Sequence, residues 1–390
     1  MGKPKIRFKG YEDDWEQRKL NEVAGKICVG FVGTCEKFYT DESGIPMYRT
    51  GNLNGLSLNR DDLKYVTNEF HQHNQKSQLK AGDILIARHG DSGKAVNYEN
   101  SEEANCLNIV IIRPDFKKCN YKFLTNCINS PECQKHIKSL SAGSTQAVIN
   151  TSEIEKLGVV IPANIDEQNR IARYFFTLDH LITLHQRKCE ETKSLKKYML
   201  QKMFPENGNC VPKIRFSGFA DDWEQRKLGE MIKEYKETVD SDCILPVLTS
   251  SKTEGVILQE EHFGRKQQHD ITGYNILPRN YCTYRNRSDG VDFTFNINKC
   301  CDKGIISKFY PVFSGNNSDV FFISLLLNNS DEIVQEIAYT CTGTGQKVLS
   351  FLDLQKMKVR VPSYDEQKEI AAYFENLDHL ITLHQRELEK

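Results

Sequence analysis

The sequence predicts a mixed α/β (α+β) chain of two globular domains and two long helices that pair as an antiparallel coiled coil about an internal pseudo-twofold axis. Three observations lead to this prediction: two short blocks recur almost unchanged, the segments between them have diverged, and the second block has the pattern of a long helix. Units of about 200 residues are much longer than solenoid repeats, which span roughly 20 to 50 residues. The chain therefore holds two copies of a domain with its connector.

The two repeated blocks define a frame around two variable segments. The first block, Pro4 to Leu20, recurs at Pro212 to Leu228 with 14 of 17 positions identical. The second block, Asp166 to Arg187, recurs at Asp365 to Arg386 with 17 of 22 positions identical. Between the blocks lie segments of 145 and 136 residues that share little sequence, Asn21 to Ile165 and Gly229 to Tyr364.

Composition excludes several classes of protein. Thirteen cysteines without a CxxC pair favour free thiols over a disulfide framework or a zinc site. The N-terminal residues lack the apolar core of a signal peptide, and no run of 18 apolar residues is present to span a bilayer. We therefore expect a soluble, cytoplasmic protein. Because the formal net charge is only -1, a DNA-binding surface would have to be a local basic patch.

The second block opens a long helix. From Asp166 to Met203 apolar residues recur with a period near 3.5, and these 38 residues include neither Gly nor Pro. Such a rod, about 57 Å long, needs a partner face to be stable. Since the same stripe recurs in the second copy, each helix is the natural partner of the other.

Each long helix has a candidate capping box and a set of residues predicted to pair. Asn164 with Glu167, and Ser363 with Glu366, have the required spacing. The predicted pairing residues are Ile171, Phe175, Leu178 and Ile182 in the first helix, and Ile370, Phe374, Leu377 and Ile381 in the second.

The histidines of the long helix are expected to be structural. His180 and His185 are five residues apart, which turns them about 140° from each other around a helix. Because they do not share a face, a metal site is not expected. His185 falls on the apolar stripe, so we expect it to pack in the helix interface.

The end of the first helix is expected to need a further apolar surface. The second copy of the helix has 14 residues fewer, so counterparts of Leu195, Met199 and Met203 are missing. We expect these side chains to pack on the second domain or on a partner subunit, and the isolated chain to be prone to aggregate.

The variable segments predict domains of one fold. Leu79 to Arg88 and Asn105 to Pro114 have the composition of buried strands, and Cys133 to Gly143 that of a helix ending at glycine. In the second segment, Leu277 to Arg285 follows the pattern of Lys80 to Arg88. The two domains are therefore expected to share a fold and to differ in surface.

The order of these motifs closely resembles that of specificity subunits of type I restriction-modification systems. Each half opens with WEQRKL, continues with a strand and loop like GDILIARHGDSGK and a turn like AGSTQ or TGTGQ, and ends with a Pro and Glu-Gln motif leading into a long LDHLI helix. The resemblance covers nearly the whole chain. It implies residues 1–162 as target-recognition domain 1, 163–205 as long helix 1, 206–362 as target-recognition domain 2 and 363–390 as a shortened long helix 2.

The resemblance also implies a function and partners. In this family, two target-recognition domains read the two halves of a split, asymmetric sequence in double-stranded DNA. The paired helices set the separation of the domains and dock two methyltransferase subunits, and restriction subunits complete the complex. The partner subunits would use S-adenosylmethionine, and ATP and Mg²⁺ for restriction.

The chain lacks the motifs of an enzyme of this kind. It has no NPPY or DPPY turn and no FxGxG loop, and the loop Gly90 to Ala95 lacks the first glycine and the Ser or Thr of a phosphate-binding loop. We therefore expect no catalytic activity, metal or cofactor of its own. A self-contained methyltransferase or nuclease, or a coiled-coil scaffold that binds only proteins, would not explain divergent domains in a constant frame.

Candidate DNA contacts are side chains that can donate or accept two hydrogen bonds, or bind phosphate, from predicted loops. In the first domain these are Arg49, Asn52, Arg88, His89, Lys94, Ser144, Thr145 and Gln146. In the second domain they are Arg265, Gln267, Gln268, Arg285, Arg287, Thr344 and Gln346.

Overall fold

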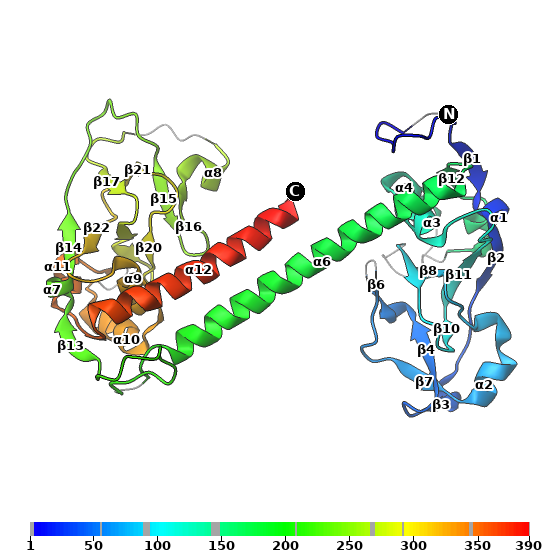
Figure 1. The fold of residues 1–390 in the computed structure, drawn as a ribbon, viewed down its shortest axis with the longest axis horizontal. Helices are drawn as coiled ribbons and strands as arrows, with labels where there is room; N and C mark the ends of the chain where they lie inside the picture. The colour runs from blue at the N-terminus through cyan, green and yellow to red at the C-terminus, as the bar shows by residue number, and fades with distance from the viewer. Residues whose placement is uncertain are drawn as a thin grey trace. The chain divides into compact units, whose positions relative to one another are not determined.

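The computed structural model describes residues 4–54, 57–88, 94–141, 149–206, 209–265, 270–290, 292–342 and 346–389. The chain divides into two compact units, Met1–Leu181 and Ile182–Lys390. They run from blue to green and from green to red in Figure 1. Each unit contains one globular α/β domain and a stretch of long helix.

The first unit alternates short strands with short helices before the long helix α6. Its strands are β1 Glu16–Lys19, β2 Ala24–Val29, β3 Tyr39–Thr40, β4 Ile45–Arg49, β5 Leu53–Asn54, β6 Ser57–Leu58, β7 Lys64–Val66, β8 Asp83–Ala87, β9 Ala95–Tyr98, β10 Asn105–Leu107, β11 Ile109–Pro114 and β12 Gly158–Ile161. Its helices are α1 Leu20–Val23, η1 Glu36–Phe38, η2 Thr50–Asn52, α2 Asn68–His73, η3 Gln75–Ser77, α3 Tyr121–Ile128, α4 Pro131–Ser141, α5 Thr151–Ile154 and the start of α6 Ile165–Lys202.

The second unit repeats this plan after the end of α6. Its strands are β13 Glu224–Lys227, β14 Ile232–Tyr235, β15 Leu248–Ser251, β16 Gly255–Leu258, β17 Asn275–Pro278, β18 Cys282–Tyr284, β19 Arg287–Ser288, β20 Phe295–Ile297, β21 Lys303–Ile306, β22 Val312–Gly315, β23 Lys347–Val348 and β24 Lys358–Val361. Its helices are α7 Leu228–Met231, α8 Gln259–Phe263, α9 Val320–Asn329, α10 Asp331–Thr340, α11 Phe351–Lys356 and α12 Tyr364–Glu389.

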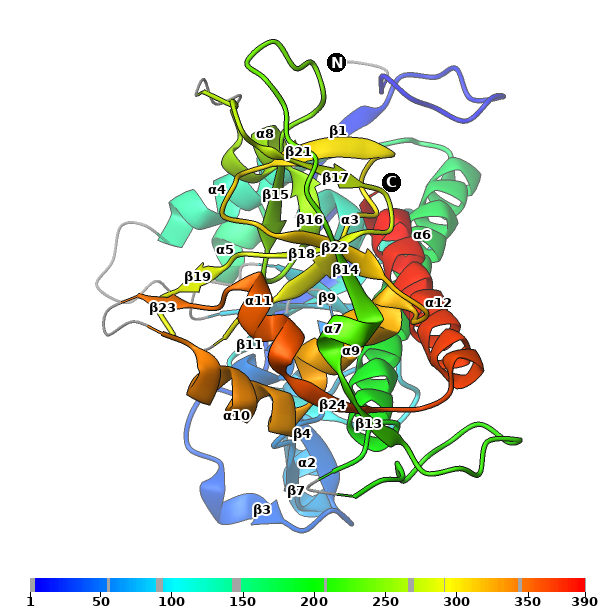
Figure 2. The same cartoon turned by 90° about the vertical axis from the view of Figure 1, so that its left-hand side faces the viewer.

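Both domains are built on the same four-stranded antiparallel sheet. The strand order is β2-β11-β8-β9 in the first domain and β14-β22-β18-β20 in the second. A two-stranded antiparallel ladder directly precedes each long helix. It pairs β1 with β12 before α6, and β13 with β24 before α12. In the second unit, β15, β16, β17 and β21 lie at one end and α9, α10 and α11 at the other (Figures 1 and 2).

In the first domain, both faces of the sheet β2-β11-β8-β9 are covered by apolar side chains. Successive side chains of a strand point to opposite faces. Ile84 and Ile86 of β8 accordingly pack with Phe123 of α3, whereas Leu85 packs with Tyr48 of β4 on the other face. A strand buried on both faces reads as a continuous apolar run, as in the sequence of β8.

One predicted strand is in fact two. The run Asn105 to Pro114 is broken at Asn108, which has a φ of +55°. Asparagine tolerates this left-handed conformation better than most residues. The break turns the chain from β10, which is parallel to β4, into β11, which is antiparallel to β2 and β8.

The end of α6 and the helix α12 run antiparallel within the second unit (Figures 1 and 2). Nδ1 of His185 lies 3.2 Å from Nδ1 of His384, and Nζ of Lys196 lies 2.5 Å from Oδ1 of Asp378. The later residue of α6, Lys196, contacts the earlier residue of α12, Asp378. The two helices are therefore antiparallel, as predicted. His185 lies in this interface facing its own counterpart in the repeat.

The predicted pairing residues pack differently from the prediction. Ile370, Phe374 and Leu377 belong to the core of the second domain. Ile171 is partly buried against the core of the first domain. The remaining four are exposed or only half-buried: Phe175, Leu178, Ile182 and Ile381. Part of each apolar stripe packs on the core of a globular domain, because each long helix begins against that core.

The end of α6 packs on the second domain, as predicted, although the stated reason was wrong. Met203 is buried in the core of the second domain and Met199 packs against it, whereas Leu195 is exposed. An antiparallel arrangement places the end of α6 beside the start of α12. The end of α6 therefore has an intramolecular partner irrespective of the length of α12.

The predicted capping boxes are half right. Oδ1 of Asn164 accepts a hydrogen bond of 2.8 Å from the N–H of Asp166, and Oγ of Ser363 accepts one of 3.4 Å from the N–H of Glu366. The carboxylates of Glu167 and Glu366 do not return to the cap, because each binds an arginine of the first repeated block.

Three general findings apply to the described part of the chain. All 13 cysteines are free thiols, as predicted. Within the described ranges there is no group of three or more His, Cys, Asp or Glu residues that could hold a metal ion. None of the described helices is both long and apolar enough to cross a membrane.

Candidate nucleic-acid interface

Arg88 and Arg285 occupy the same place in the two domains. Each follows the third strand of its four-stranded sheet, β8 or β18, as the sequence parallel predicted. The N–H of Arg88 donates to the carbonyl of Asn108, and its own carbonyl accepts from the N–H of Ile149 at 3.1 Å. Arg88 is half-buried, and its Nε has no hydrogen-bond partner among the described residues. Arg285 is exposed.

In the second unit, Arg285 and Arg287 line one cavity of about 710 Å³. The residues that line it come from β15, β19 and the loops beside them: Ser250, Lys252, Arg285, Arg287, Ser288, Asp289, Gly290, Asp292, Phe293, Thr294 and Tyr310. Sequence reasoning missed Ser250, Lys252 and Thr294. The only signal for Ser250 and Lys252 was the polar turn SSKTEG between two strands, and Thr294 had none.

An ion pair spans the polar side of this cavity. Nζ of Lys252 contacts Oδ2 of Asp292, and Oγ of Ser288 donates to Oδ1 of the same carboxylate at 3.0 Å. The hydrogen bonds from Lys252 and Ser288 lower the pKa of Asp292. The carboxylate of Asp292 thereby links the turn after β15 to the end of β19.

Arg287 is held by an aromatic ring. Its guanidinium carbon lies 4.6 Å from the centre of the Phe309 ring, within cation–π distance. Strand β19, which contains Arg287, pairs with β23, so that Ser288 lies opposite Lys347. Gln346, which is exposed, directly precedes Lys347 in this pairing. Planar donors presented in this way suit base edges and phosphates.

In the first unit, the structure corrects the role of Asn52. This residue is buried, its Oδ1 accepts the N–H of Arg49 at 2.9 Å, and its Nδ2 donates to the carbonyl of Asp61 at 3.1 Å. Asn52 therefore shapes its own loop and is not available to bases. Nη2 of Arg49 lies 2.8 Å from Asp62, whose pKa is lowered by hydrogen bonds from Lys64 and Arg49.

The remaining predicted contacts are not brought together in the described part of the chain. Lys94 and Arg265 are exposed, each at the edge of a loop. The others lie outside the described residues: His89, Ser144, Thr145, Gln146, Gln267, Gln268 and Thr344.

Comparisons with known proteins agree on one family. The sequence model of the type I restriction modification DNA specificity domain matches residues 12–194 and 220–390. A putative type I restriction enzyme MjaX specificity subunit of Methanocaldococcus jannaschii is 25% identical over 402 residues, covering 97% of this chain and 90% of that protein. The EcoBI specificity subunit of Escherichia coli is 23% identical over 165 residues, covering 41% of this chain and 34% of that protein.

A solved structure has the same fold. The crystal structure of a type I restriction-modification S subunit from M. genitalium aligns with a TM-score of 0.59. The alignment covers 98% of this chain and 94% of that one, at 14% sequence identity. Similarity at this level of identity concerns the fold.

Proposed function

This chain belongs to the type I restriction modification DNA specificity family, and we propose that its two domains each read one half of a split, asymmetric DNA sequence. The specificity subunit is the DNA-recognition component of a type I restriction-modification system. Two readers joined through one frame would contact two half-sites at a set separation, as dimeric DNA-binding proteins do. Because the readers differ in sequence, the half-sites would differ as well.

The observation that carries this proposal is the contrast between a constant frame and different surfaces. Both domains use the same four-stranded sheet and present an arginine after its third strand. In the second domain that arginine is exposed beside the Lys252 and Asp292 pair, whereas in the first it is half-buried. The same position in one fold is thus surrounded by different chemistry, as expected of readers with different targets.

We further propose that the chemistry resides in partner subunits. Two methyltransferase subunits would dock on the long helices and use S-adenosylmethionine. Restriction subunits would use ATP and Mg²⁺. This chain would supply recognition without catalysis or a cofactor of its own, and would act in the cytoplasm, where the DNA is. Purified chain incubated with DNA, S-adenosylmethionine and Mg²⁺ should leave the DNA unmethylated and uncut, and methylation by the chain alone would contradict this division of roles.

A domain exchange tests the two-reader proposal. Residues 21–160 are replaced by the corresponding segment of another family member, the chain is expressed with its methyltransferase partner, and the methylated sequence is determined across the host genome. One half of the sequence should change and the other should stay. Replacing residues 229–361 is the matched control and should change the opposite half. A change in both halves, or in neither, would overturn the proposal.

A further inference from the structure

The cavity of about 710 Å³ in the second unit mixes cations with carboxylates. Lys252, Arg285 and Arg287 line it together with Asp289 and Asp292. All of the residues that line it belong to the second variable segment, which shares little sequence with the first. Two half-sites can be told apart only by surfaces that differ between the two domains. The side chains of this cavity are therefore candidates for a residue that sets specificity.

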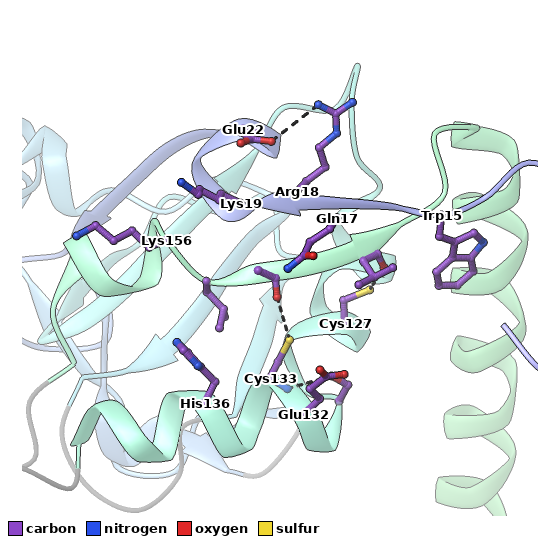
Figure 3. A pocket seen from close by; sticks show the side chains of 14 residues that line it. Trp15, Gln17, Arg18, Lys19, Glu22, Cys127, Glu132, Cys133, His136 and Lys156 are labelled. Carbon is purple, nitrogen blue, oxygen red and sulfur yellow. Dashed lines mark hydrogen bonds and ion pairs between the residues drawn. The ribbon is translucent and has the colours of Figure 1, made fainter. Parts of the chain in front are cut away.

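A cavity of the first unit has the opposite character. It has a volume of about 780 Å³, and residues of β1, β12 and α4 contribute to its lining (Figure 3). Nη1 of Arg18 lies 3.8 Å from Oε2 of Glu22 at this cavity. The same pair recurs in the second unit as Arg226 and Glu230, at 3.6 Å. A charge pair that occurs in both units cannot distinguish one half-site from the other.

In the cavity of the second unit, the carboxylate of Asp292 is held from two sides. Oγ of Ser288 donates to its Oδ1 at 3.0 Å, and Nζ of Lys252 contacts its Oδ2. The turn that contains Lys252 is itself anchored, because Nδ2 of Asn296 in β20 donates to the carbonyl of Ser251 at 2.8 Å. The side chain of Asp292 is nevertheless 66% exposed. The carboxylate is thus fixed in position and still open to a ligand.

The carboxylate of Asp292 has hydrogen-bonding capacity to spare. An ionised carboxylate only accepts hydrogen bonds, and its two oxygens offer about four lone-pair positions. Ser288 and Lys252 each occupy one of the two oxygens, which leaves positions on both. A phosphate of the DNA backbone would be repelled here, because it is an anion that also only accepts. The group that binds to this carboxylate must therefore be a hydrogen-bond donor.

Two arginines beside the carboxylate allow DNA to approach it. Arg285 and Arg287 are both exposed and both line the cavity. Asn286 lies between them, and both of its backbone groups are hydrogen-bonded, to Phe309 and to Leu349. Guanidinium groups bind phosphates and the acceptor edge of guanine. They offset the negative charge of the carboxylate, so that a duplex can bring a donor group up to it.

The major groove of DNA contains one kind of donor that fits. The amino groups at N4 of cytosine and N6 of adenine donate there, whereas guanine and thymine present only acceptors and a methyl group. We propose that Asp292 accepts a hydrogen bond from such an amino group, and thereby selects cytosine or adenine at one position of the half-site that the second domain reads. This inference rests on the proposed function, because it requires that the second domain reads DNA.

The test uses the full chain in complex with its methyltransferase partner, without S-adenosylmethionine. Selection from random duplex DNA gives the sequence preference of the wild-type complex and of its variants. Asp292→Ala should lower discrimination at one base pair of the second half-site by about ten-fold or more, and leave the first half-site unchanged. The matched control is Lys252→Ala, which removes the ion pair but keeps the carboxylate. It should weaken binding to all sequences alike.

A modified base then tests the contact itself. At the base pair that Asp292→Ala relaxes, N4-methylcytosine or N6-methyladenine replaces the selected base. The methylated amino group keeps its Watson–Crick hydrogen bond but has no free N–H in the major groove. The wild-type complex should bind the modified duplex about ten-fold more weakly or worse. The Asp292→Ala complex should bind both duplexes equally.

Two outcomes would overturn the role of Asp292 and leave the proposed function intact. One is that Asp292→Ala weakens binding to all sequences alike, as expected of Lys252→Ala, because the carboxylate would then only hold its ion pair. The other is that the wild-type complex binds the modified and unmodified duplexes equally. A wild-type complex without any preference in the second half-site would overturn the proposed function, and this inference with it.

Discussion

The guanidinium of Arg215 donates two hydrogen bonds of 2.7 Å to the carboxylate of Glu366, a residue that is almost completely buried. The pair joins the first repeated block of the second unit to the start of α12. The same contact joins Arg7 to Glu167 in the first unit, at 2.7 and 2.8 Å. The glutamine that follows each of these glutamates also makes equivalent hydrogen bonds in the two units. Gln168 and Gln367 each accept a backbone N–H from the start of the helix packed against them, and each donates to a proline carbonyl.

The buried carboxylate of Glu366 should be essential to the second unit. Glu366→Gln leaves the guanidinium of Arg215 without its anion, and removing one partner of a buried pair costs about 3–5 kcal/mol. Urea denaturation followed by circular dichroism measures the loss. The matched control is Asp302→Asn, which breaks an exposed pair with Arg279 and should change stability by less than about 1 kcal/mol. Equal losses of stability for the two variants would mean that the ion pair between Arg215 and Glu366 does not stabilise the second unit.

Two counterparts in the repeat should differ strongly in their contribution to stability. Phe374 is packed on Phe204 in the second unit, so Phe374→Ala should destabilise that unit by about 3–5 kcal/mol. Phe175→Ala, at the equivalent position of the first unit, should cost less than about 1 kcal/mol because its ring is exposed. Differential scanning calorimetry of both variants tests this difference. A comparable loss for Phe175→Ala would show that its ring is covered in solution.

Arg285 should contribute to one half of the target only. Arg285→Ala should weaken binding by about 1–3 kcal/mol and relax specificity at a single base pair, if the guanidinium reads a base edge. Binding of the complex with its methyltransferase partner to a set of single-base variants of the target measures both effects. Arg279→Ala removes an exposed guanidinium of the same domain that does not line the cavity, and is the control. Uniform weakening on all targets, with a smaller salt dependence, would instead identify Arg285 as a phosphate contact.

The thiols should differ in reactivity according to burial. Burial raises the pKa of Cys119 to about 12, so almost none of it is thiolate at pH 8, whereas Cys300 is exposed to reagents. Brief treatment with iodoacetamide at pH 8, followed by mass spectrometry of peptides, should label Cys300 well before Cys119. In 8 M urea all 13 cysteines should react. Labelling of Cys119 as fast as Cys300 under native conditions would contradict the buried position.

The order of residues was sufficient to predict the architecture. The repeated blocks, the 38-residue helix, the buried strand before Arg88 and its counterpart before Arg285 are all local patterns or internal comparisons. Periodicity and turn residues act over a few positions of the chain, so they can be read without knowing what lies nearby in space. The antiparallel pairing of the end of α6 with α12 was also predicted from the repeat, although the apolar residues assigned to it pack elsewhere.

The folded structure decided which partner each side chain meets. Asn52 was a candidate base contact, but a backbone N–H three residues away and a carbonyl nine residues away bury it in its own loop. Glu167 and Glu366 had the spacing of capping residues, yet arginines 160 and 151 positions earlier bind them. Phe175 and Phe374 are the same residue of one motif, and only one of them is covered. Burial and pairing depend on groups that folding brings together from distant parts of the chain, so identical local sequences can end in different environments.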